Sequence, residues 1–191
     1  MLPYIVIAGS LVGLFGMLYY AKDTFFGSTK PNLVSWVMWC SADLIGTAAS
    51  VAAGATWAAL PTFVAGFGPL IVIIASLANK KAYWKLGKLD YLCGSLSALA
   101  LVLWVVTKAP SVAIVFAIAT DALAAVPTVI KGWRHPETES SSAYVAGIIS
   151  ALSAFTAITV WTFPEYAFPA YLVAINAVIA FPLFLGRLAK K

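Results

Sequence analysis

The chain has 191 residues, of which 62% are hydrophobic and 10% are charged, and its formal net charge is +5. Apolar runs of about 17–25 residues, the length of a helix that crosses a hydrocarbon core, exclude an ordinary soluble domain and predict a polytopic membrane protein. The basic charge invites a nucleic-acid interpretation. Its distribution along the chain instead indicates membrane topology, so no nucleic-acid partner is expected.

Seven apolar segments are predicted as transmembrane helices, and they leave little chain for any soluble domain. In chain order they are residues 3–20, 33–55, 57–78, 91–107, 110–130, 143–163 and 166–188. The first segment has no basic residue before it and no small-residue cleavage site. It is therefore interpreted as a retained helix and not as a signal peptide.

The basic residues predict the orientation of these helices. With the N-terminus outside, the outer segments carry only Lys108, and all other Lys and Arg residues lie on the cytoplasmic side,. The cytoplasmic residues are Lys22, Lys30, Lys80, Lys81, Lys85, Lys88, Lys131, Arg134, Arg187, Lys190 and Lys191. This asymmetry requires an odd number of spans. It predicts an external N-terminus and a cytoplasmic C-terminus in a plasma or bacterial inner membrane.

Residues that shape helices fall at corresponding positions in the two halves of the chain. A shift of about 108 residues places Pro61 on Pro169 and Gly68 on Asn176, which indicates an internal repeat,. Spans one to three then repeat as spans five to seven, with the fourth span as a linker. The predicted fold is an all-α membrane protein with a 3+1+3 parallel repeat about an axis along the membrane normal. Its parts are residues 1–79, the linker 80–108 and residues 109–191.

A motif around Pro127 indicates a family. The proline lies near a predicted helix end, and a basic residue and a Ser-rich turn follow it. This arrangement resembles the PQ-loop motif, and the 3+1+3 plan resembles the SWEET and PQ-loop transporters. The run Asp43-Leu44-Ile45-Gly46 is similar to one that follows the PQ motif in lysosomal carriers, and Asn176 matches the central asparagine of SWEETs. Thr128 replaces the glutamine of the motif, and the sugar specificity of SWEETs does not carry over.

Three polar side chains, Asp43, Asp121 and Asn176, fall near the middle of predicted spans. A carboxylate at that depth is costly unless it is paired, hydrated or protonated, and burial favours its neutral form. Asp43 and Asp121 are therefore predicted to couple protons to transport. The alternative is that each carboxyl accepts hydrogen bonds from Ser or Thr on a neighbouring helix and only fixes the packing.

The second span is predicted to present a binding face. Trp36, Trp39 and Asp43 share roughly one side of this helix, and aromatic rings beside a carboxylate suit a polar ring or a cation. The alternative is that both tryptophans face lipid. The predicted solute-binding residues are Asn176, Trp39, Asp43, Trp36 and Gly68, with polar Asn176 facing open Gly68 across the axis.

Prolines at 61, 127 and 169 are predicted hinges, because breaks in spans are tolerated where they line a cavity. Close helix packing is the alternative explanation for the small residues around them. No cofactor is expected, and the single histidine, His135, excludes most metal sites,. No catalytic motif of the common hydrolase classes occurs, so the chain is not predicted to be an enzyme.

These features favour a carrier or facilitator of a small polar solute, such as a sugar, amino acid, amine or vitamin. The mechanism would be alternating access, with proton coupling through Asp43 or Asp121. One alternative is a seven-helix sensor that binds a ligand without moving it. Another is a membrane enzyme or lipid-handling protein that uses Asp43 with Asp121. The expected partners are the solute and the lipid bilayer, and the sequence leaves a homo-oligomer open.

Overall fold

The computed structural model describes residues 3–79, 82, 84–107 and 109–188, and throughout these ranges all regular secondary structure is helical. The elements are α1 (Pro3–Phe25), α2 (Leu33–Ala52), η1 (Trp57–Ala59), α3 (Leu60–Ala78), α4 (Lys88–Thr107), α5 (Pro110–Arg134), η2 (Pro136–Thr138), α6 (Ser142–Ala154) and α7 (Phe163–Leu188). Each predicted span corresponds to one α-helix. Among the topology charges, Lys80, Lys81, Lys108, Lys190 and Lys191 lie outside the described residues.

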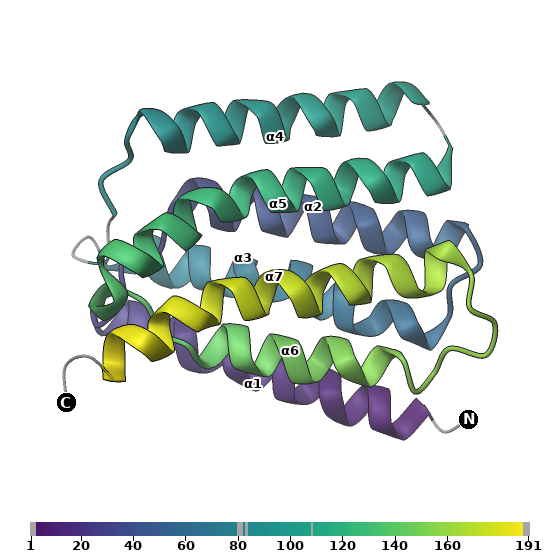
Figure 1. Cartoon of the computed structure of the whole chain (residues 1–191), viewed down its shortest axis with the longest axis horizontal. Helices are drawn as coiled ribbons and strands as arrows, with labels where there is room; N and C mark the ends of the chain where they lie inside the picture. Colours follow the sequence, from purple (N-terminus) through teal and green to yellow (C-terminus); the bar gives the residue numbers. More distant parts are fainter. Residues whose placement is uncertain (1–2, 80–81, 83, 108, 189–191) are drawn as a thin grey trace.

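Five helical segments are long and apolar enough to cross a membrane. They are Pro3–Phe25, Leu33–Ala52, Trp57–Ala78, Ser111–Arg134 and Phe163–Gly186. This confirms the all-helical fold class and is consistent with a multi-pass membrane protein. Successive helices run in alternating directions, and α1 begins at the end of the bundle opposite to the one where α7 ends (Figure 1).

The sixth helix is shorter than predicted. It was expected over residues 143–163, but α6 ends at Ala154. Ser153 donates from Oγ to the Ser150 carbonyl at 2.6 Å, and Thr156 donates from Oγ1 to the Ser153 carbonyl at 2.8 Å. Because such hydroxyls compete with the backbone for helical carbonyls, the chain tightens into turns after Ser153. Hydropathy alone does not register this competition.

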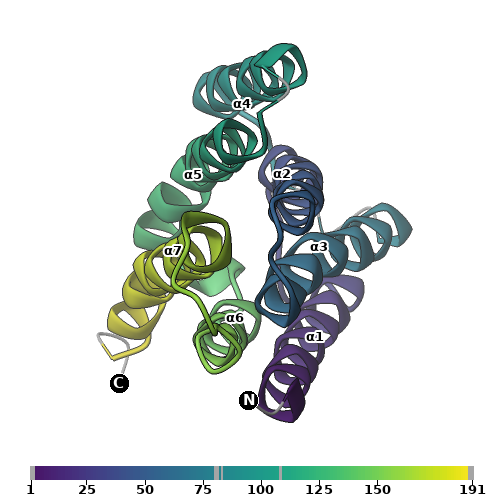
Figure 2. The same ribbon diagram turned by 90° about the vertical axis from the view of Figure 1, so that its right-hand side faces the viewer.

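The helices form two groups of three that pack against each other. In one group α3 lies between α1 and α2, and in the other α7 lies between α5 and α6 (Figure 2). Across the junction α1 packs on α6 and α2 packs on α5, while α4 covers the outer side of α5 (Figure 2). The two groups therefore have the same internal order and meet through corresponding pairs of helices.

Small residues allow the closest of these contacts, between α1 and α6. Gly9, Gly13 and Gly16 lie against Ser153, Ser150 and Ala146, and a Cβ on any of the three glycines would come within 2.8 Å of its neighbour. A larger side chain would separate the two helices, since backbone approach of this kind needs glycine. This contact between α1 and α6 forms one side of the junction between the two groups of helices. The cavity lies at that junction.

Candidate functional site

An interior cavity lies at the junction of the two groups of helices. It is narrow, with room for about three water molecules,. All helices except α4 contribute to its lining: Met17, Trp36, Trp39, Asp43, Ala65, Pro69, Asp121, Tyr144, Leu172, Ile175, Asn176 and Ile179. Four of the five predicted solute-binding residues are in this set, together with Asp121.

Two carboxyl groups meet at the wall of the cavity. Asp43 of α2 and Asp121 of α5 are 2% and 3% exposed, and their side chains lie in hydrogen-bonding contact with each other. Two carboxylates this close repel strongly, so a proton held between them is the stable arrangement when no other cation is present. The predicted pair of acidic residues is therefore a single unit and not two separate sites.

Other groups hold Asp121 in place. The Tyr171 hydroxyl donates a hydrogen bond to Asp121 Oδ2, and Trp39 Nε1 donates to the Asp121 backbone carbonyl at 3.2 Å. Asp43 is less constrained, because its Oδ1 is buried without a hydrogen-bond partner among the described residues. One carboxyl is thus oriented by its neighbours, and the other keeps an oxygen available for a guest.

Glycines determine how close α2 comes to its neighbours at this level. A Cβ on Gly66 of α3 would lie 2.8 Å from the Leu44 nitrogen and 3.0 Å from Asp43 Cβ. A Cβ on Gly46 would lie 2.3 Å from the ring of Phe168 in α7. Both glycines allow close approach of helix backbones, so the segment of α2 around Asp43 packs tightly between α3 and α7.

Aromatic side chains form another part of the cavity wall. Trp36 is fully buried and Trp39 is 7% exposed, so both point inward and neither faces lipid. Their ring centroids are 5.3 Å apart at 77°, and the Tyr144 ring lies 6.5 Å from Trp39 at 78°. All three of these aromatic residues line the cavity. Trp36 Nε1 is a buried donor with no acceptor in the described part of the chain.

Asn176 and Gly68 are not equivalent across the cavity. Asn176 lines it, and its Nδ2 donates to the Leu172 carbonyl at 2.8 Å. Gly68 does not line it, because the Met17 side chain fills the space in front of the glycine: a Cβ there would lie 2.5 Å from Met17 Cγ. The expected pairing of polar Asn176 with open Gly68 is therefore replaced by a pairing with a methionine from α1.

A second, smaller cavity adjoins the first through Met17, Ala65, Leu172 and Asn176, which line both. Pro61 is among the residues that line it. Pro61 itself lies in the first turn of α3, where a proline breaks no helical hydrogen bond,. Pro127 and Pro169 lie inside α5 and α7, and neither borders these cavities.

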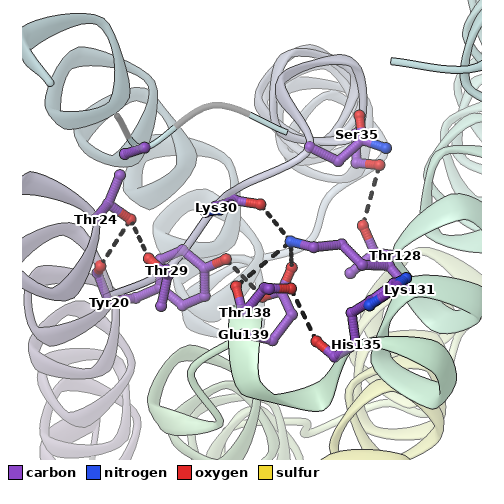
Figure 3. Close-up of polar contacts among 12 residues, drawn as sticks. Tyr20, Thr24, Thr29, Lys30, Ser35, Thr128, Lys131, His135, Thr138 and Glu139 are labelled. Atoms are coloured by element: carbon purple, nitrogen blue, oxygen red, sulfur yellow. Dashed lines mark hydrogen bonds and ion pairs between the residues drawn. The ribbon is translucent and has the colours of Figure 1, made fainter. Parts of the chain in front are cut away.

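A buried polar cluster closes one end of the junction (Figure 3). Lys131 Nζ lies 2.6 Å from Glu139 Oε1, and the two side chains are 1% and 0% exposed. Tyr20 donates from its hydroxyl to Glu139 Oε2 at 2.5 Å, and Tyr144 donates to the same oxygen at 3.3 Å. The Trp84 ring centroid lies 4.8 Å from Lys131 Nζ. We call these five residues the latch cluster.

The latch cluster also joins two turns that are far apart in sequence. Lys131 Nζ donates to the Lys30 carbonyl, and the Lys30 backbone nitrogen donates to the Thr138 carbonyl at 3.0 Å. One turn connects α1 to α2, and the other connects α5 to α6. The sequence interpretation placed Lys131 at a helix end on the cytoplasmic side and did not predict its ion pair; the overlooked signal is Glu139, eight positions later in the following turn.

A comparison with family models, curated proteins and solved structures found no match for this chain. The functional interpretation therefore rests on the cavity, the carboxyl pair and the latch cluster.

Proposed function

We propose that this chain is a membrane carrier or facilitator of a small polar solute that works by alternating access. The observation that carries the proposal is the cavity between two similarly ordered groups of helices, with the contacting carboxyls of Asp43 and Asp121 in its wall. Carriers built from repeats bind their solute near the midplane, at the repeat interface.

The helix packing supports a 3+1+3 parallel repeat. Exchanging the two groups converts the contact of α1 with α6 into that of α5 with α2, and both contacts are present. Helix α4 lies outside both groups, as a linker would (Figure 2). On this basis the chain is a remote and atypical relative of the SWEET and PQ-loop transporters, with its N-terminus outside and its C-terminus in the cytoplasm.

The two ends of the junction are closed differently, which suits alternating access. In the proposed orientation the latch cluster closes the cytoplasmic end with a buried ion pair and hydrogen bonds. At the outer end, Ala58 packs on Ala154 and Ile158 without polar contacts between these side chains. Rocking one group against the other opens one closure at a time.

Transport by reconstituted protein tests the proposal. Liposomes containing the full chain receive a pH gradient, and uptake is measured for labelled sugars, amino acids, amines and vitamins. We expect at least one solute to accumulate. Asp43→Asn should abolish pH-driven uptake while leaving solute exchange largely intact, and Asp23→Asn, at the end of α1, serves as the control. Uptake of none of the solutes, or full pH dependence in Asp43→Asn, would contradict the proposal.

The carboxyl pair also favours a second candidate function, that of an intramembrane hydrolase. Two contacting carboxyls that share a proton resemble an acid–base dyad, and the cavity has room for water,. This candidate predicts cleavage of a fluorogenic transmembrane peptide that is lost in both Asp43→Asn and Asp121→Asn. Solute uptake without peptide cleavage would exclude it.

A further inference from the structure

We propose that the solute is a small organic cation, an amine that also carries a hydrogen-bond acceptor, and that it enters the Asp43–Asp121 pair in exchange for a proton. This inference rests on the proposed function and names the chemical class of its solute.

The charge of the cavity wall requires a positive guest. Among the described residues that line the cavity there are two acidic side chains and no Lys, Arg or His. The buried cation in the last turn of α5, Lys131, is already bound to Glu139 at 2.6 Å. A neutral solute would gain no charge attraction from the carboxyl pair, and an anionic solute would be repelled by it.

The exchange balances in charge. The empty pair holds one proton and carries one negative charge. When an ammonium group binds between the two carboxyls, the shared proton leaves to solvent and both carboxylates face the guest. Two negative charges and one positive charge again leave one negative charge. The net charge buried in the membrane does not change, and the attraction of the ammonium to both carboxylates offsets the cost of desolvating it.

The groups around the pair do not supply a competing charge. From α7, Tyr171 donates to Asp121, and from α6, Tyr144 is bound to Glu139 at 3.3 Å. From α2 itself, Cys40 lies one turn before Asp43. Helix α3 presents Gly66 to Asp43, and α1 presents Met17 to the cavity. The acid of α4, Asp90, is bound to Asn32 at 2.5 Å and does not line the cavity.

Two further features define the guest. Trp36 and Trp39 line the same cavity as the two carboxyls, and a tryptophan ring attracts a cation,. Trp36 Nε1 is a fully buried donor without a partner in the described chain, so a guest with an acceptor oxygen satisfies it,. The cavity has room for about three water molecules, which limits the guest to a few heavy atoms in this conformation,.

Ethanolamine fits this description and is the first probe. It carries an ammonium group and a hydroxyl oxygen on two carbons. Ethylene glycol is its neutral counterpart, and propylamine keeps the charge but lacks the acceptor. Sodium chloride at matched ionic strength tests whether an inorganic cation suffices. Each compound is added to the purified full chain in detergent, and the thermal unfolding midpoint is measured, because a ligand that binds only the folded state raises it.

We expect ethanolamine to raise the unfolding midpoint, and propylamine to bind about tenfold more weakly because it lacks one hydrogen bond. Ethylene glycol and sodium chloride should produce no shift. Calorimetry in two buffers of different ionisation enthalpy should show about one proton released per bound ethanolamine, from the carboxyl pair. Asp43→Asn should lose both effects. Trp36→Phe should retain proton release and lose the preference for ethanolamine over propylamine.

The inference would be overturned by equal stabilisation by ethylene glycol, by equal stabilisation by sodium chloride, or by ethanolamine binding without proton release. Absence of stabilisation by any amine would also overturn it. The liposome assay separates this inference from the proposed function. Transport of a neutral sugar would support the carrier function and contradict the cationic solute. Amine binding with proton release but without any transport would support the cation site and contradict the carrier function.

Discussion

Tyr20 and Glu139 lie 119 positions apart in the sequence, yet the Tyr20 hydroxyl donates a 2.5 Å hydrogen bond to Glu139 Oε2 inside the protein. Tyr20 belongs to α1, and Glu139 lies in the turn before α6, so this bond crosses the junction between the two groups of helices (Figure 3). Both ends are buried, and the acceptor also faces Lys131. The bond therefore holds closed the end of the cavity that the latch cluster covers.

Removing the donor should weaken this closure. Tyr20→Phe keeps the ring that packs on Trp36, with centroids 4.7 Å apart, and deletes only the hydroxyl. We expect the free energy of unfolding to fall by about 1.5–3 kcal/mol, the contribution of a hydrogen bond to a charged group. Denaturant titration in mixed micelles measures this change. Tyr4→Phe is the matched control, because Tyr4 is 69% exposed. An effect of the same size in both variants would show that the bond contributes nothing specific.

The ion pair of the latch cluster should be sensitive to loss of one partner and tolerant of loss of both. Glu139→Gln leaves the buried Lys131 ammonium without its counter-charge, and we expect a loss of about 3–5 kcal/mol in the free energy of unfolding. Combining it with Lys131→Met removes the unpaired charge and should restore much of that loss.

A second pair in the same turn provides the control for this prediction. His135 and Glu137 are 3.6 Å apart, and both side chains are 51% exposed. Solvent screens such a pair, so Glu137→Gln should change the free energy of unfolding by less than about 1 kcal/mol. If Glu137→Gln and Glu139→Gln destabilise equally, burial of the Lys131–Glu139 pair is not what matters.

Hydropathy located the seven α-helices of the described residues, because each long apolar run has to become helical in a membrane,. It did not locate the end of α6, where hydroxyls at Ser153 and Thr156 compete for backbone carbonyls within an apolar run. The ends of α1 and α5 also extend past their predicted limits into charged residues, because a helix does not stop where its hydropathy falls. Local polar chemistry, and not average hydropathy, decides these boundaries.

The candidate site was predictable in its residue types and less so in its contacts. Asp43 and Asp121 were recognisable as carboxyls at similar depth, but their contact follows from the packing of α2 on α5. Aligning the two halves placed Gly68 opposite Asn176. It could not show that Met17, from a third helix, fills the space in front of the glycine. The latch cluster forms because the turn between α1 and α2 contacts the turn between α5 and α6. No local pattern in the sequence specifies this contact.

Topology provides a direct test of the proposed repeat. In the proposed topology, seven spans put the two ends of the chain on opposite sides of the membrane, and the distribution of Lys and Arg predicts a cytoplasmic C-terminal end,. A reporter that works only in the cytoplasm should be active when it is fused after Lys191. A tag placed before Met1 should be accessible from outside intact cells. Finding both ends on one side would remove the parallel repeat and with it the proposed alternating access.

The contact of Gly147 with Asn176 connects helix packing to the proposed solute site. A Cβ on Gly147 of α6 would lie 2.8 Å from Asn176 Oδ1, closer than side chains tolerate. Gly147→Ala should therefore push the Asn176 amide away from α6, toward the cavity that it lines. We expect a loss of about 1–3 kcal/mol in the free energy of unfolding, typical of overpacking, together with weaker solute binding.

Three further variants complete this test. Asn176→Ala should weaken solute binding by about 1–3 kcal/mol, because a polar partner of the solute is lost. Gly147→Ala combined with Asn176→Ala should regain stability, since the clash is gone, but should not regain binding. Gly132→Ala is the control, because the nearest atoms to its added Cβ lie at 3.4 Å, on Leu183 and Pro182. Binding and unfolding are measured on the same reconstituted protein. If the double variant binds as well as the original chain, the Asn176 amide does not contact the solute, and the site must then be sought at the carboxyl pair alone.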